Sequence, residues 1–70
     1  MNILIEEPPE YNPVELIHLA KSAQPTLRYA DFAVVFKCEI PTIARWMCGN
    51  RKPSKPQRIW AAELKRKWGL

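Results

Sequence analysis

Two short amphipathic segments, separated by a break of only three or four residues, place the strongest limit on how this chain folds. The spacing of apolar residues predicts a helix that ends at Phe36 and a second that begins near Pro41, since proline suits the first position of a helix. Residues 37–39 form the predicted turn. Gly49 predicts the end of the second helix, because glycine readily adopts the left-handed conformation of a helix cap. The rest of the chain must therefore pack against two helices that are joined by a tight turn.

Two further helices are predicted, one before this pair and one after it. Residues 12–15, with the sequence Asn-Pro-Val-Glu, are typical of a helix start, because the asparagine caps the helix and the proline needs no N–H partner there. The helix is expected over residues 13–23. Ser54, three residues before Gln57, predicts a capping box and a helix over residues 55–67.

Apolar periodicity indicates an all-α fold, a small four-helix domain with the two central helices as a helix-turn-helix unit. The chain shows no strand pattern, internal repeat or Gly/Ser linker. The first helix of the central pair is expected to begin at Thr26 or Leu27, after a break at Pro25. The residues expected to face the core are Leu16, Leu19, Ala20 and Ala23, with Ile17 at the edge; Leu27, Ala30, Ala33 and Phe36, beside Phe32 or Tyr29; Ile43 and Trp46, beside Met47; and Trp60, Ala61, Leu64 and Trp68.

Residues 1–11 are expected to form a loosely ordered N-terminal arm in front of the domain, which covers residues 12–70. Pro8 and Pro9 exclude a helix interior, because each proline lacks an N–H and restricts the residue before it. Residues 3–5, Ile-Leu-Ile, form a short apolar patch that could dock on the body, pair with a second chain or be disordered. The segment contains three glutamates and no basic start, which is not the pattern of a signal peptide.

The chain offers few residues for catalysis or metal binding. Its 70 residues include Cys38, Cys48 and His18 as the only cysteines and histidine, too few for a disulfide scaffold or a four-ligand zinc site. His18 has no evident acid or nucleophile partner, so no catalytic residue, metal or cofactor is expected, and an enzyme is not expected. No apolar run approaches the roughly 20 residues of a membrane span. We expect a soluble, cytoplasmic protein with reduced thiols and no membrane partner.

The charge of the chain is divided unevenly between its two halves. Residues 1–35 carry two basic and five acidic residues, a net charge of −3, and residues 36–70 carry nine basic and two acidic residues, a net charge of +7. For most basic proteins such charge is simply solvated surface. Here the positive half begins at the predicted turn, which favours a polyanion as partner.

The stretch from Phe32 to Trp46 resembles the helix-turn-helix of lambda-repressor/Cro-like regulators. The matching residues are Ala33 in the first helix, Phe36 and Cys38 beside the turn, Thr42, Ile43 and Trp46 in the second helix, and Gly49, Arg51 and Pro53 after it. The resemblance covers about half of the chain. It implies that the second helix lies in the major groove of double-stranded DNA and that the protein is a small transcriptional regulator.

The chain departs from the family pattern in three respects. Lys37 stands where the family usually has a glycine with positive φ, and Glu39 stands where a serine or threonine often caps the second helix. The Glu39 carboxylate can face the first N–H groups of that helix, less ideally than a hydroxyl; it would also repel phosphates, or it could accept from a cytosine N4 amine. Ile40 and Pro41 replace polar residues that often touch bases. The family also usually has a fifth helix, whereas this chain predicts four.

The residues expected to contact DNA are those in or near the second helix of the pair whose side chains suit phosphates or base edges. Basic side chains at its ends suit phosphates, Arg45 suits guanine O6 and N7, Thr42 is a second candidate reader, and Ile40 suits a thymine methyl. The full predicted set is Lys37, Ile40, Thr42, Arg45, Asn50, Arg51, Lys52 and Lys55. A homodimer, or a complex with a partner protein, is expected on DNA, because one small domain offers limited contact area.

An alternative function remains open from the sequence. The residues at positions 39–41 make a poor base-reading surface, and the first half of the chain is acidic. These features favour a protein-interaction module, for example an antitoxin-like partner, that uses a helix-turn-helix scaffold without reading DNA sequence.

Overall fold

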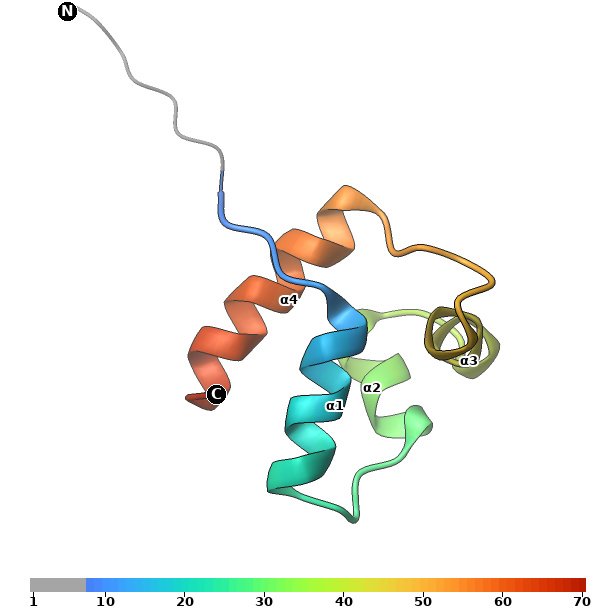
Figure 1. Ribbon diagram of the computed structural model, residues 1–70, viewed down its shortest axis with the longest axis horizontal. Helices are drawn as coiled ribbons and strands as arrows, with labels where there is room; N and C mark the ends of the chain where they lie inside the picture. Colours follow the sequence, from blue (N-terminus) through green and yellow to red (C-terminus); the bar gives the residue numbers. More distant parts are fainter. Residues whose placement is uncertain (1–7) are drawn as a thin grey trace, which may run out of the picture.

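Four helices joined by short loops make up residues 8–70, the part of the chain that the computed structural model describes (Figure 1). The helices are α1 (Pro13–Ala23), α2 (Tyr29–Phe36), α3 (Ile40–Cys48) and α4 (Lys55–Trp68). The predicted small all-α fold is confirmed. Residues 3–5, the predicted apolar patch of the arm, lie outside the described residues.

Helices α1 and α4 begin at the residues that the sequence predicted. The Asn12 side chain accepts a hydrogen bond from the Val14 amide at 3.0 Å, and Pro13 is the first residue of α1. At the start of α4, the Ser54 amide donates to Oε1 of Gln57 at 2.7 Å, which is one of the two bonds of a capping box. Local side-chain chemistry therefore determines where these two helices begin.

The start of α2 differs from the prediction. The helix begins at Tyr29, two or three residues later than expected, and Arg28 is its N-cap residue. The Leu27 amide donates to the Gln24 carbonyl at 3.1 Å, so the preceding residues form a turn. Asp31 then accepts from the Arg28 amide at 2.9 Å, which makes Arg28 the favoured starting point.

The core is a single apolar cluster with contributions from all four helices. Its buried members are Leu16, Ile17, Ala20, Phe32, Ala33, Phe36, Ile43, Trp46, Ala61 and Leu64. Most of these residues were predicted to face inward. Each buries apolar surface that would otherwise meet water, and such burial is the main stabilising term in a domain of this size.

The predicted buried faces were wrong at several positions. Ile17 is fully buried, whereas Leu19 is 39% exposed and Ala23 is exposed. The reason is that α1 packs through residues 13, 16, 17 and 20, and its last turn extends past the core. Ala30 and Trp68 were also predicted to be buried, but Ala30 is exposed, and Trp68, the last residue of α4, is 38% exposed because it borders an open hollow.

The turn between α2 and α3 has the geometry that the sequence predicted. Lys37 has φ 54° and ψ 46°, in the left-handed region, and the Cys38 amide donates to the Ala33 carbonyl at 2.9 Å. Across the turn, the rings of Phe36 and Trp46 meet edge to face, with their centroids 5.5 Å apart. Gly49 ends α3 with φ 80°, as predicted.

Helix α4 is connected to the pair α2 and α3 by a side-chain hydrogen bond. Nε1–H of Trp60 donates to the Val35 carbonyl oxygen at 2.8 Å. That oxygen lies in the last turn of α2, where carbonyl groups lack a partner within the helix. The indole therefore satisfies an otherwise open acceptor and connects α4 to the end of α2.

The segment before α1 also contacts α4. The Tyr11 amide donates to the Arg58 carbonyl at 3.0 Å, and the Glu10 carboxylate pairs with Nε of Arg58 at 2.8 Å. Nη1 of Arg58 donates to the Pro53 carbonyl at 2.7 Å, in the loop that follows α3. The described end of the predicted arm is thus fixed to α4, while the boundary at residue 12 stays a prediction.

Candidate nucleic-acid interface

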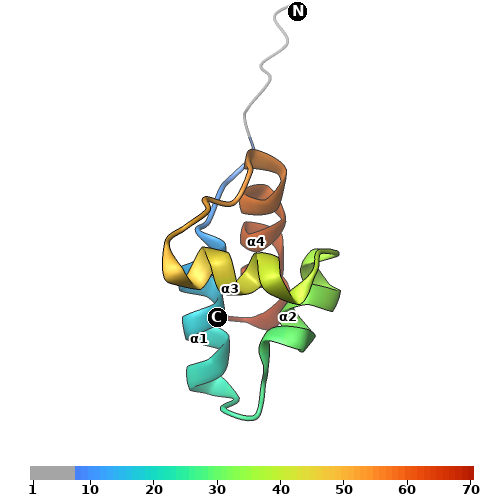
Figure 2. The ribbon, with the colours of Figure 1, turned by 90° about the vertical axis from the view of Figure 1, so that its right-hand side faces the viewer.

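The outer face of α3 is open to solvent. In Figure 2 this helix lies across the front of the other three, and no helix of the described part covers it. Its inner side carries Ile43 and Trp46, which are 0% and 3% exposed. Its outer side carries Ile40, which is 50% exposed, together with Pro41 and Arg45, which are also exposed. The helix is therefore anchored on one side and free to contact a partner on the other.

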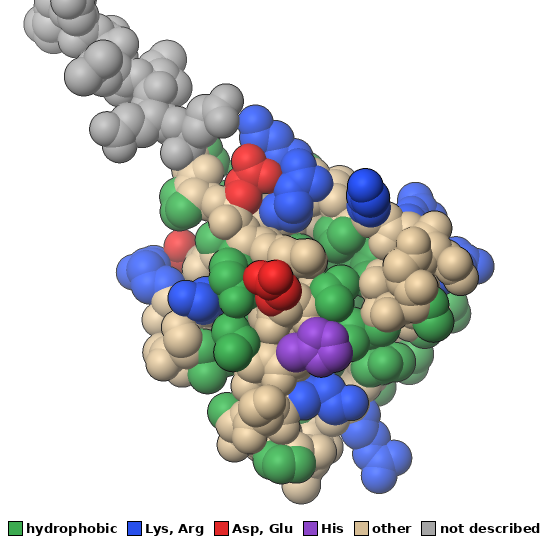
Figure 3. All heavy atoms as spheres, in the orientation of Figure 1, with side chains coloured by type: hydrophobic (Ala, Val, Ile, Leu, Met, Phe, Trp, Pro, Cys, Tyr) green, Lys and Arg blue, Asp and Glu red, His purple; other side chains and the backbone are tan. Residues whose placement is uncertain are grey.

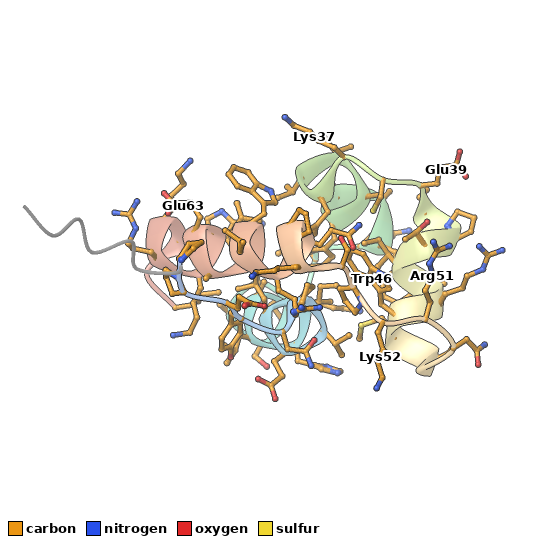
Figure 4. All side chains as sticks on the ribbon, turned by 90° about the horizontal axis from the view of Figure 1, so that it is seen from above. Lys37, Glu39, Trp46, Arg51, Lys52 and Glu63 are labelled. Atoms are coloured by element: carbon orange, nitrogen blue, oxygen red, sulfur yellow. The ribbon has the colours of Figure 1, made fainter. Side chains whose placement is uncertain are left out.

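Basic side chains lie at both ends of this open face. Figure 4 shows Lys37 and Lys52 on opposite sides of the molecule, with Arg51 on the α3 side between them and Trp46 pointing inward. Lys37, Arg51 and Lys52 are all exposed. Within residues 8–70, these three side chains form no ion pair or hydrogen bond with the protein, and the same is true of the Arg45 side chain. Their charges are consequently available to an external anion.

A polar hollow lies between α3, the loop after it and the start of α4. It has a volume of about 270 Å³. The residues that line it are Cys38, Thr42, Trp46, Arg51, Lys52, Ser54 and Gln57. Hydroxyl and amide groups from two helices therefore lie beside two cations, at a helix N-terminus, which is a suitable environment for phosphate oxygens.

The sequence prediction did not include Ser54 and Gln57 among the contact residues. From the sequence, their capping box indicates a helix start, and the N–H groups and positive dipole end of that start predict a phosphate site, but no contact was assigned to the two side chains. In the structure the Ser54 hydroxyl donates to Oε1 of Gln57 at 2.9 Å. The side-chain amide nitrogen of Gln57 makes no hydrogen bond within residues 8–70.

The other predicted contact residues are distributed around α3 with one exception. Ile40, Thr42 and Arg45 lie on α3 itself, and Asn50 follows its cap, with the Asn50 amide donating to the Arg45 carbonyl at 3.0 Å. Lys55 instead lines a second hollow, together with Pro8, Pro9, Pro56, Ile59, Trp60 and Glu63. The structure thus places Lys55 beside the N-terminal segment, away from the polar hollow.

Glu39 introduces a negative charge at the start of α3. It is the N-cap residue, and its carboxylate accepts no capping hydrogen bond from the N–H groups of the helix. Figure 4 shows the side chain pointing away from the body. Burial, together with the nearby Glu39 carboxylate, raises the pKa of the half-buried Cys38 thiol. Cys38 is therefore a neutral packing group at pH 7.

Away from α3 the surface is mixed. On the face shown in Figure 3, Lys and Arg side chains lie along the margins, separated by hydrophobic and neutral surface. An apolar hollow of about 390 Å³ lies between the end of α1, the start of α2 and the chain end. Its lining includes Leu27, Val35, Trp68 and Leu70. None of the described helices has the length and apolar character needed to cross a membrane.

Comparison with family models, with curated proteins and with solved structures found no match.

Proposed function

We propose that this protein is a DNA-binding helix-turn-helix protein that acts as a small transcriptional regulator of the Cro-like type. The observation that carries the proposal is the outer face of α3, which no described helix covers, with cations at both of its ends that form no ion pair within residues 8–70. A helix presented in this way has the width and charge that suit a major groove. The activity is binding, with no catalytic step and no cofactor.

Each contact residue has a proposed role. Phosphates of the two strands bind Lys37 at one end of α3 and Arg51 and Lys52 at the other, and the polar hollow receives one of these phosphates. Arg45 donates to guanine O6 and N7, and Thr42 lies at the edge of the groove. Asn50 contributes at the margin of the interface, and Lys55, which lines the other hollow, has no contact assigned. Two copies bind a pseudo-palindromic site, because one domain supplies limited contact area.

The test is a salt titration of binding to random duplex DNA, measured by fluorescence anisotropy. The affinity of the wild-type protein should fall steeply with salt, because bound cations release counterions from DNA. In the double variant Arg51→Ala/Lys52→Ala, the slope of log K against log salt should be smaller by about 0.9 for each phosphate that a bound subunit no longer neutralises.

A matched control is available on α4. Arg66→Ala/Lys67→Ala removes the same charge from the last turn of α4, at the opposite end of the molecule from α3 (Figure 1). Arg66 pairs with Glu63 at an exposed position, so its loss has little effect on stability. The control should retain most of the wild-type slope. An equal decrease of the slope in both variants, or no binding of the wild-type protein at low salt, would contradict the proposal.

A second candidate function is a protein-interaction module on the same scaffold. Exposed apolar side chains favour it: Val34 is 78% exposed, Ile40 is 50% exposed, and Trp68 borders the apolar hollow. Exposed apolar surface gathered in one place is typical of protein-binding sites, and the hollow lined by Leu27, Val35, Trp68 and Leu70 is such a place. This candidate predicts that affinity for random DNA is undetectable even at low salt.

A further inference from the structure

The part of α3 that would enter a groove first is apolar. Base contacts of a helix-turn-helix come mainly from the N-terminal residues of its second helix. Here those residues are Ile40, which is 50% exposed, and Pro41, which is exposed, with half-buried Ala44 one turn further along. Thr42 is turned toward the polar hollow that Arg51 also lines.

The composition of α3 excludes the usual direct contact to adenine. Asparagine and glutamine read adenine through paired bonds to N6 and N7, and the sequence of α3, Ile-Pro-Thr-Ile-Ala-Arg-Trp-Met-Cys, contains neither. Asn50 is the nearest asparagine, and it follows the helix cap at Gly49. An A·T pair beside Ile40 and Pro41 therefore offers these two side chains one complementary feature, the 5-methyl group of thymine.

We propose that the protein recognises A·T pairs through thymine methyl groups and that Ile40 is the residue that determines this specificity. The inference rests on the proposed DNA-binding function and names what its interface reads. An isoleucine side chain that closes over a methyl group removes apolar surface of both from water. Burial of one methyl is worth roughly a fourfold change in affinity, and about sixteenfold when two half-sites each contain one.

The experiment replaces thymine by uracil in a duplex that the protein selects from a random library. Uracil pairs as thymine does and lacks only the methyl group, so the phosphate contacts are unchanged. The wild-type protein should bind the uracil duplex roughly fourfold to sixteenfold more weakly. Ile40→Ala should bind the thymine duplex more weakly than wild type does, and it should bind the two duplexes with nearly equal affinity.

A second variant controls for removal of exposed apolar surface in general. Val34 lies on the outer side of α2 and is 78% exposed, so Val34→Ala should keep the full preference for thymine. Equal wild-type affinity for both duplexes would overturn the inference while leaving the proposed function intact. A full thymine preference in Ile40→Ala would overturn the assignment of Ile40. If the wild-type protein binds no DNA at all, the proposed function fails together with the inference.

Discussion

Lys37 is the one non-glycine residue with positive φ among residues 8–70. Its φ of 54° costs a residue with a Cβ about 1 kcal/mol relative to glycine, which adopts this region without a clash. The same side chain is exposed at one end of the α3 face, where its charge suits a phosphate. Stability and affinity therefore place opposite demands on this position.

Lys37→Gly should stabilise the fold and weaken DNA binding at the same time. Removal of the left-handed strain should raise the free energy of unfolding by about 1 kcal/mol, measured by urea denaturation. Removal of the charge should lower affinity and the salt slope. Lys37→Ala is the matched control, because it removes the same charge but keeps the Cβ. Equal stability of the two variants would show that the turn is not strained.

Residue-level predictions succeeded where the cause is local. The cap residues Asn12 and Gly49 and the Ser54–Gln57 box follow from the chemistry of neighbouring residues, and the structure shows each where it was expected. The sequence left the role of Glu39 open, because a longer side chain at an N-cap has several orientations; in the structure it makes no capping bond and extends into solvent.

At the level of elements, the bond between Trp60 and Val35 connects α4 to the helix-turn-helix. The sequence predicted Trp60 as a core residue, but it could not identify Val35 as the acceptor. The two residues are 25 positions apart, and the contact depends on how α4 crosses the end of α2. The wrong assignment of Leu19 has the same origin, because the buried side of α1 is decided by where the other helices lie.

Trp60→Phe should destabilise the domain more than its decrease in buried area suggests. The change keeps an aromatic ring but removes the donor, leaving the Val35 carbonyl without its partner, at a cost of about 1–2 kcal/mol. Circular dichroism in a urea titration would measure the change. Trp68→Phe is the control, since Trp68 is 38% exposed, and it should change stability by less than about 0.5 kcal/mol. If both variants are destabilised by the same amount, the bond to Val35 has no special role.

At the level of the whole molecule, the open face of α3 and the proposed dimer predict the form of the DNA site. Selection from random duplexes should return two related half-sites with centres about 10 base pairs, one helical turn, apart. Arg45→Ala should lose the preference for guanine at one position of each half-site and keep the spacing, because a guanidinium is the group that reads guanine. A single unpaired site would contradict the dimer, and an unchanged guanine preference would contradict the role of Arg45.

The sequence predicted most residues of the α3 face, but it did not predict the polar hollow beside them. The helix pair, the left-handed turn and the exposed basic residues near α3 all follow from short-range patterns. The polar hollow does not, because it forms only where the start of α4 meets α3, and that meeting depends on tertiary packing. Lys55 illustrates the limit, since it is close in sequence to Arg51 but lines a different hollow.

Arg58 connects the segment before α1 to the loop that follows α3. One guanidinium holds the carbonyl of Pro53 and the carboxylate of Glu10, and the backbone of the same residue holds the Tyr11 amide. The segment before α1 and the loop that carries Arg51 and Lys52 are thus both hydrogen-bonded to the same residue. Loss of the Arg58 side chain would therefore remove one contact from each of the two segments at once.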